Sequence, residues 1–172
     1  MQNALVLNTY REPARTQTVY AFVKRSFDII CSLLLIVLLM PVLLVVAVIS
    51  AVDTKSNPLF IQTRMGRNNR PFRMIKFRTM SPKAPSNMAT HRFTDALDYI
   101  SPVGGALRKL SLDELPQLFN ILIGDMSFVG PRPVVLTETD LLRIRDRNGS
   151  LRVRPGLTGW AQVNGRDLVS VA

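Results

Sequence analysis

An uncharged run from Ile29 to Val52 constrains the fold of this chain more than any other feature of the sequence. Leu, Val and Ile dominate it, and it exceeds the ~20 residues that a helix needs to cross a bilayer. A cleaved secretory signal is a poor match, because the run is too long and begins late. The sequence therefore predicts a polar lead over residues 1–23, a membrane-embedded segment over 24–55 and one small domain over 56–172.

Two features bear on how this segment sits in a membrane. Pro41 lies at its middle, where a proline removes a helical hydrogen bond and breaks or kinks the helix. Basic residues flank both ends, with Lys24 and Arg25 before the run and Lys55 after it, whereas a simple span usually has an asymmetric charge distribution. These features favour a re-entrant hairpin with both flanks on the same side. A kinked single span is the alternative.

The charge of the chain points to an anionic partner. The formal net charge is +10, and residues 54–112 hold eleven basic residues against only Asp95 and Asp98. Nucleic acid, anionic lipid headgroups and a nucleotide diphosphate would all suit such a surface, so charge alone does not select among them. One cysteine and one histidine exclude an intrachain disulfide and a zinc site of the usual Cys/His type.

A β-hairpin is predicted over residues 59–80. Two stretches of strand character are separated by a cluster of turn residues, Gly66, Asn68, Asn69 and Pro71. In the second strand Lys76 and Arg78 are two residues apart, so they are predicted to project to the same face and could hold a diphosphate. A solvated strand edge is the alternative.

The motif SLDEL at 111–115 predicts a helix start. Ser111 followed by Glu114 fits a capping box, the helix would begin near Leu112 or Asp113, and Gly124 is placed to end it. Asp113 and Glu114 could then be first-turn acids that merely stabilise the helix.

The same two acids also suit phosphate chemistry. A helix start would hold the Asp113 carboxylate ionised, and an ionised carboxylate can attack phosphorus to form an aspartyl-phosphate. A divalent cation is needed to screen the two anions, and Mg²⁺ suits an all-oxygen site made by Asp113 and Glu114. Arg132 stands between Pro131 and Pro133, which fix the backbone that would present its guanidinium to phosphate.

Most of the chain resembles the bacterial sugar transferases, the monotopic phosphoglycosyl transferases that load a sugar phosphate onto a polyprenyl phosphate. The resemblance rests on four segments in this order: KRSFDIICS at 24–32, FIQTRMGRNNRPFRMIKFRTM at 60–80, LRKLSLDELPQLFNILIGDMSFVGPRP at 107–133 and RPGLTGWAQVNGR at 154–166.

The resemblance implies a two-step reaction. Asp113 would attack the β-phosphorus of a UDP-sugar, UMP would leave, and the phosphosugar would pass to undecaprenyl phosphate, with Glu114 as the dyad partner. Four basic residues match family positions that clamp phosphates: Lys76, Arg78, Arg108 and Arg132. It also implies a re-entrant helix broken at Pro41, an inner-membrane location with the catalytic domain facing the cytoplasm, and a role in bacterial glycoconjugate assembly, without a nucleic-acid partner.

The expected fold is mixed α/β, with a membrane helix-hairpin beside a small domain of a short sheet and interfacial helices. The sequence departs from the family at Met40, where small members often carry serine, and at 101–104, where a basic residue is more usual. It ends soon after Arg166, where relatives continue, and the short lead predicts no additional spanning helices before the apolar run. The sugar, pathway and oligomeric state are not specified, and a homo-oligomer is compatible with the sequence.

The sequence leaves two alternatives to the transferase function open. A membrane-anchored basic module that binds anionic lipid or nucleic acid would explain the charge and the anchor, but it would not require the SLDELPQ motif. A truncated, catalytically inactive paralogue would keep the fold and lose the chemistry.

Overall fold

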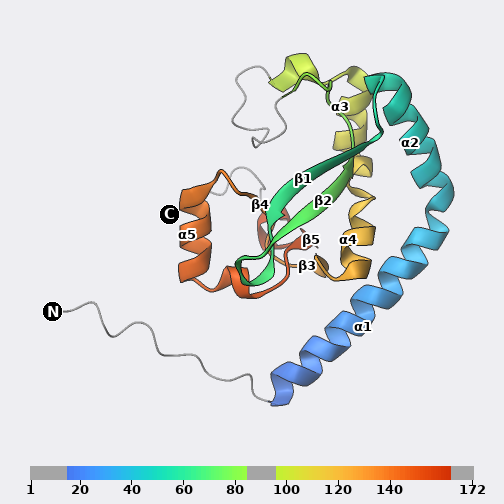
Figure 1. The fold of residues 1–172 in the computed structure, drawn as a ribbon. Coiled ribbons are helices and arrows are strands. Elements are labelled where there is room, and N and C mark those ends of the chain that lie inside the picture. Colours follow the sequence, from blue (N-terminus) through green and yellow to red (C-terminus); the bar gives the residue numbers. More distant parts are fainter. Residues whose placement is uncertain (1–14, 85–95, 164–172) are drawn as a thin grey trace.

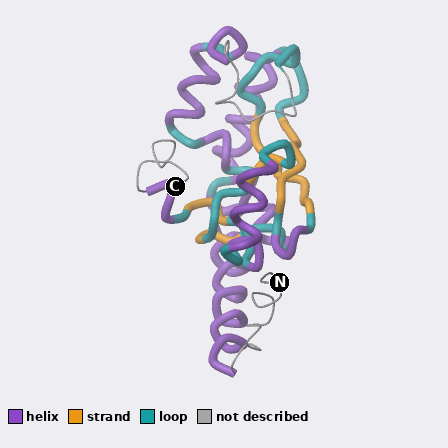
Figure 2. Tube along the Cα trace, turned by 90° about the vertical axis from the view of Figure 1, so that its left-hand side faces the viewer, coloured by secondary structure: helices purple, strands orange, loops and turns teal. Residues whose placement is uncertain are grey.

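The computed structural model describes residues 15–84 and 96–163 as a mixed α/β structure (Figure 1). Its helices and strands are α1 (Arg15–Leu38), α2 (Met40–Thr54), β1 (Leu59–Met65), β2 (Pro71–Phe77), α3 (Pro102–Lys109), α4 (Gln117–Ile123), β3 (Ser127–Val129), β4 (Val134–Val135), α5 (Thr139–Arg147), β5 (Gly156–Thr158) and α6 (Trp160–Val163). Short 3₁₀ turns lie at Arg67–Asn69, Ala96–Tyr99, Leu112–Glu114 and Ser150–Arg152. The N-terminal part of α1 extends beyond the other described elements (Figure 2).

The predicted helix break at Pro41 is confirmed. The ring nitrogen of Pro41 has no hydrogen to donate, and α1 ends at Leu38 while α2 begins at Met40. The chain bends by 66° between α1 and α2. No single helix in the described ranges is long and apolar enough to cross a membrane, whereas the bent pair Thr18–Leu38 and Met40–Thr54 meets the length and composition requirements together.

Helix α1 buries polar residues and exposes apolar ones. The stripe that faces the rest of the chain includes Asp28, Ser32 and Ile36, one helical turn apart, and Asp28 is only 1% exposed. Apolar side chains elsewhere on the two helices are open, with Phe22 73% exposed and Val52 71% exposed. This distribution is the reverse of a helix in a water-soluble domain, and it suits a helix whose outer surface meets lipid.

The N-terminal part of α1 is attached to the domain by charged groups. Arg25 donates from Nη1 and Nη2 to the carbonyls of Ile121 and Leu122, at 2.7 and 2.8 Å, near the C-terminus of α4. The carbonyl of Ile121 also accepts from the N–H of Gly124 at 3.1 Å, and the guanidinium adds a charged donor at this helix end. The carboxylate of Asp28 accepts from Ser127 Oγ at 3.1 Å. The KRSFD segment therefore docks α1 onto α4 and β3.

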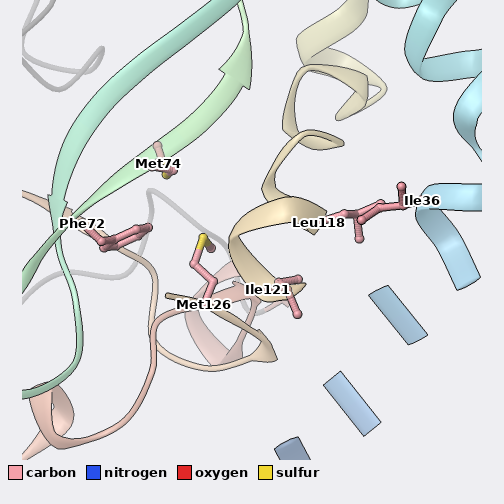
Figure 3. Close-up of a cluster of buried hydrophobic side chains, with 6 residues drawn as sticks. All are labelled: Ile36, Phe72, Met74, Leu118, Ile121 and Met126. Atoms are coloured by element: carbon pink, nitrogen blue, oxygen red, sulfur yellow. The ribbon is translucent and has the colours of Figure 1, made fainter. Parts of the chain in front are cut away.

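The predicted hairpin is confirmed. Strands β1 and β2 pair in antiparallel register from Leu59 with Phe77 to Met65 with Pro71. Strand β4 extends the sheet on the other side of β1, in the order β2-β1-β4, while β3 and β5 form a separate parallel pair. The side chains of Phe72 and Met74 pack against Leu118 and Ile121 of α4, with Ile36 of α1 on the far side (Figure 3).

Asn120 closes the open edge of β2. Its side chain donates from Nδ2 to the carbonyl of Arg73 at 2.8 Å and accepts at Oδ1 from the N–H of Ile75 at 3.0 Å. One amide thus takes the place of a neighbouring strand, and Asn120 itself is 0% exposed. Because β2 carries a residue of the candidate site, this contact helps to fix that site.

We expect Asn120→Leu to lower the free energy of unfolding by about 2–3 kcal/mol, because both strand-edge groups lose their partner in a buried position. Thermal unfolding in detergent measures the change. Asn57→Leu, which removes a solvent-exposed hydrogen bond from the N–H of Leu59 to Asn57 Oδ1 at 2.8 Å, should lower the free energy of unfolding by only about 0.5–1 kcal/mol. Equal effects of the two substitutions would contradict this role.

Helix α3 begins with a side-chain cap. Ser101 caps the helix by accepting from the N–H of Gly104 at 2.8 Å, with Pro102 following at the first turn. Gly104 allows α3 to approach the end of the hairpin, since a Cβ there would lie 2.3 Å from the carbonyl oxygen of Thr79.

Candidate active site

A cavity of about 410 Å³ opens between the hairpin, the Pro131-Arg132-Pro133 turn and the break between α1 and α2. Its polar lining includes Arg64, Lys76, Glu114, Gln117, Arg132 and Gln162. Its apolar lining includes Leu35, Leu39, Leu115, Leu118, Phe128 and Leu157. The cavity therefore joins a charged region to an apolar wall that comes partly from the exposed helices.

The two predicted catalytic acids lie on a 3₁₀ turn, Leu112–Glu114, and not at a helix start. Ser111 adopts a left-handed conformation with φ 57° and makes no side-chain cap, so the predicted capping box is wrong. Helix α4 starts only at Gln117, after Pro116, and it ends as predicted at Gly124, whose φ is 99°. The left-handed Ser111 turns the chain sharply between α3 and the acids.

Glu114 reaches the cavity and pairs with Lys76. Lys76 Nζ lies 2.7 Å from Glu114 Oε1, and both side chains are mostly buried. A charge-assisted contact at this depth is stronger than one at the surface. The pair connects the C-terminal end of β2 to the acid turn, and it leaves one cation and one carboxylate side by side in the cavity wall.

Asp113 lies beneath this wall. It is 7% exposed and does not line the cavity. Burial is the largest influence on the Asp113 carboxyl and raises its pKa, and the neighbouring Glu114 carboxylate raises it further. Lys76, Arg108 and a backbone hydrogen bond lower the pKa, but they do not cancel the effect of burial. The predicted helix start is therefore not what acts on this carboxyl, and burial works against the ionised form that the sequence led us to expect.

Arg108 approaches the acids from α3. Its Nε donates to Thr79 Oγ1 at 2.8 Å. Burial lowers the pKa of the Arg108 guanidinium, and the nearby Asp113 carboxylate offsets part of this effect. Thr79 is itself buried and follows the hairpin. The structure thus brings four of the candidate site residues together: Lys76, Arg108, Asp113 and Glu114.

Arg78 lies outside the cavity. It follows the last residue of β2, and its Nε donates to the carbonyl of Asn57 at 2.9 Å while its guanidinium lies 5.6 Å from the centre of the Phe60 ring. Phe60 is also the residue that pairs with Lys76 across the hairpin, so the contact of Arg78 with its ring agrees with the predicted shared face of Lys76 and Arg78, although Arg78 does not line the cavity. In this structure Arg78 holds the linker between α2 and β1.

Arg132 lines the cavity on the turn between two prolines. Arg145 of α5 donates from Nη1 to the carbonyl of Arg132, and Arg64 of β1 donates from Nη1 to the carbonyl of Pro133 at 3.3 Å. Two further arginines therefore hold the turn that presents Arg132.

Three kinds of lining residue were not predicted. Arg64 could have been found from the strand register, because Arg64 and Lys76 lie on the same face of the hairpin. Leu35 and Leu39 carry no signal that separates them from the rest of the apolar run. Gln162 lines the cavity with a buried Oε1 that accepts no hydrogen bond within the described residues, which leaves this oxygen open to an N–H or O–H group that enters the cavity.

Comparisons with known proteins identify the family of this chain. Residues 19–172 match the family described as Bacterial sugar transferase. The chain is 41% identical over 148 residues to a UDP-N-acetylgalactosamine-undecaprenyl-phosphate N-acetylgalactosaminephosphotransferase from Aeromonas hydrophila, which covers 84% of this chain and 34% of that protein. It is 39% identical over 144 residues to the UDP-glucose:undecaprenyl-phosphate glucose-1-phosphate transferase of Escherichia coli, covering 83% of this chain and 31% of that protein.

A smaller relative is covered more fully. The chain is 40% identical over 163 residues to the exopolysaccharide production protein ExoY of Sinorhizobium fredii, covering 87% of this chain and 72% of ExoY. The chain thus spans about a third of the length of the two large relatives and almost three quarters of the small one. The match over residues 19–172 includes every element around the cavity, and the chain belongs to the bacterial sugar transferase family.

Proposed function

We propose that this chain transfers a sugar phosphate from a UDP-sugar to a polyprenyl phosphate, through a covalent intermediate on Asp113. The observation that carries the proposal is the composition of one cavity, in which Lys76, Glu114 and Arg132 share the lining with Leu35 and Leu39. A phosphate with a lipid tail and a water-soluble diphosphate both find suitable groups there. The names of the relatives, which specify undecaprenyl phosphate and UDP-sugars, support the same substrates.

In the first step an Asp113 carboxylate oxygen attacks the β-phosphorus, and the bond from that phosphorus to the bridging oxygen breaks. UMP leaves with the electron pair. In the second step an oxygen of the lipid phosphate attacks the same phosphorus, which releases Asp113 and leaves a lipid diphosphosugar. Lys76 and Arg108, which flank Asp113 in the structure, would stabilise the charge on the equatorial oxygens.

We also propose Mg²⁺ as a cation bound at the two acids. The described residues hold no cluster of three or more His, Cys, Asp or Glu side chains, so a cation at this site would have few protein ligands. Mg²⁺ is commonly bound by one or two carboxylates together with water and substrate phosphates. Asp113 and Glu114 would hold it, and when bound it would screen the carboxylate from the diphosphate.

We further propose that α1 and α2 enter a bacterial inner membrane and return to its cytoplasmic face. Both ends of the bent pair contact the same small domain: Arg25 of α1 binds carbonyls of α4, and Ser50 of α2 donates to the carbonyl of Arg78 at 2.6 Å. Flanks fixed to one domain of this size do not lie on opposite sides of a ~30 Å hydrocarbon core. The break at Pro41 would then lie at the deepest part of the segment.

Intact-protein mass spectrometry tests the covalent step. Detergent-purified chain incubated with Mg²⁺ and a panel of UDP-sugars, without lipid, should gain the mass of one phosphosugar and release UMP. Asp140→Asn, which removes an exposed acid of α5, should behave like the parent, whereas Asp113→Asn should form no adduct. Transfer to a prenyl phosphate without any adduct would contradict the intermediate, and neither adduct nor transfer with any donor would favour an inactive paralogue.

A further inference from the structure

Arg64 is a largely buried cation in the cavity wall whose hydrogen bonds go to neutral groups. Its Nε and Nη2 donate to Gln62 Oε1 at 2.9 and 2.6 Å, and its Nη1 donates to the carbonyl of Pro133 at 3.3 Å. A guanidinium has five N–H groups, so two remain after these contacts within the described part of the chain. A buried guanidinium is usually matched by a carboxylate, because burying its charge is costly.

The charges around Arg64 do not compensate for its burial. Burial and the neighbouring Arg132 lower its pKa to about 10, and the smaller opposing effects of Glu138 and Glu114 do not cancel them. The guanidinium of Arg145 is affected in the same way by burial and by Arg132, again with Glu138 opposing. Arg132 thus lies close enough to Arg64 and to Arg145 to repel both guanidinium groups, and an anion bound beside Arg132 would relieve the repulsion.

The fold holds Arg64 and Arg132 at one place. The β1–β4 pairing sets Arg64 opposite Val135, two residues after the Pro131-Arg132-Pro133 turn ends. Gln62 orients the guanidinium of Arg64 from the same strand, and Arg145 holds the carbonyl of Arg132 from α5. This degree of positioning would be unnecessary for a solvated charge, and it suits recognition of an anion with fixed geometry.

Arg64 and the Lys76–Glu114 pair enter the cavity from different positions along the hairpin. Lys76 pairs with Phe60 in the hairpin, and Arg64 lies four residues further along β1 on the same face. At 3.3 Å per residue, the Cα atoms of the two strand positions are ~13 Å apart along the sheet. Glu114 lies close enough to Arg64 to oppose the lowering of its pKa, so the two groups are neighbours within one cavity.

We propose that Arg64 binds a phosphoryl group and forms, with Arg132, an anion subsite separate from the group at Lys76 and Glu114. Arg145 is a positioning residue for this subsite. The proposal rests on the proposed function for the identity of the ligands: the phosphoryl group belongs either to the nucleotide of the donor or to the prenyl phosphate. Both sources share the chemistry that the two guanidiniums recognise.

Isothermal titration of the detergent-purified full chain with UDP and, separately, with farnesyl phosphate distinguishes the two sources. We expect Arg64→Gln to raise the Kd of one of them at least tenfold and to change the other by less than about threefold. Arg73→Gln removes an exposed charge from the neighbouring strand, away from the cavity, and should leave both Kd values within twofold of the parent. A folded Arg64→Gln chain with both Kd values unchanged, or a parent that binds neither ligand, would overturn the subsite.

Arg64→Lys covers the case in which the glutamine variant does not fold. Lysine keeps the charge but not the planar fork that Gln62 and Pro133 engage, so the affected Kd should rise about fivefold. An unchanged Kd in a folded lysine variant would also overturn the proposal. The adduct measurement on the parent chain is independent of these titrations. If the parent forms the adduct and Arg64→Gln binds both ligands normally, only the subsite is contradicted. If Arg64→Gln loses binding and the parent forms no adduct, only the covalent reaction is contradicted.

Discussion

Asp113→Asn is expected to abolish phosphosugar transfer and, at neutral pH, to make the fold more stable than the parent. Loss of the nucleophile should lower the transfer rate by about 10³-fold or more. The stability gain follows from burial, which is the largest influence on this carboxyl and raises its pKa. An amide of nearly the same shape carries no charge to bury. We expect an increase of about 1 kcal/mol in the free energy of unfolding, of the size seen when a functional strain is removed.

The pH dependence of this gain has a defined sign. The folded chain holds the Asp113 proton more tightly than the unfolded chain, so the parent loses stability as pH rises from the ordinary aspartate pKa to the raised one. The loss of stability caused by the ionised Asp113 is complete at pH values above the raised pKa and absent below about pH 4. The difference in Tm between Asp113→Asn and the parent should therefore be positive at pH 7.5 and shrink toward pH 4.

Glu114→Gln is the matched control for this prediction. It removes the neighbouring carboxylate and with it the 2.7 Å contact to Lys76, so it should give no gain in stability at neutral pH. An Asp113→Asn chain that unfolds below the parent at pH 7.5 would show that Lys76 and Arg108 stabilise the ionised acid by more than burial costs.

Lys76→Gln is expected to lower the transfer rate by about 100-fold and to shift the acidic limb of the pH–rate profile to higher pH. Lys76 is the group that most strongly lowers the pKa of the buried Asp113, and it would also face the phosphoryl oxygens. Without it the pKa of Asp113 rises further, so a smaller fraction of the chain carries the nucleophile at a given pH. Initial rates between pH 5 and 9, at saturating UDP-sugar, measure both effects.

The controls for Lys76 separate charge from position. Lys76→Arg keeps a cation at the same place on β2 and should leave the acidic limb near that of the parent, with a smaller loss of rate. Lys109→Gln removes an exposed charge near the end of α3 and should change neither quantity. If the transfer rate of Lys76→Gln is lower at every pH but the acidic limb of its pH–rate profile does not shift, Lys76 binds substrate without affecting the pKa of Asp113.

The parts of the fold that follow local chemistry were predictable from the sequence. Pro41 lacks a donor, and the helix breaks beside it. The turn residues between Gly66 and Pro71 lie between two strands whose pairing then follows from alternation. Gly124 takes a positive φ that other residues rarely adopt, and α4 ends there.

The parts that depend on distant contacts were not predictable. Strand β4 is two residues long and exists because Val134 and Val135 pair with β1, a contact that no local pattern announces. Ser111 has the residue type of a helix cap, but the close approach of α3 to the hairpin places it in a tight turn instead. The grouping of Asp113, Glu114, Lys76 and Arg108 was predicted, whereas the burial of Asp113 needed the packing of α3, the 3₁₀ turn and β2.

Arg78 and Arg64 show the same limit for the site. They are equally basic and lie in one motif, yet Arg78 falls one residue beyond β2 and binds the linker, while Arg64 faces the cavity. The carbonyls and side chains within reach of each guanidinium, which the sequence does not specify, decide which of the two borders the cavity.

Leu35 and Leu39 sit beside the helix break and border the same cavity as Lys76 and Arg132. If the apolar surface of α1 and α2 is immersed in lipid, an acceptor would reach the cavity by lateral diffusion, and its supply would follow its mole fraction in the membrane plane. The donor would arrive from solution, so its supply would follow its concentration per volume. Diluting vesicles with buffer would then slow use of the donor alone, whereas adding inert lipid would slow use of the acceptor alone.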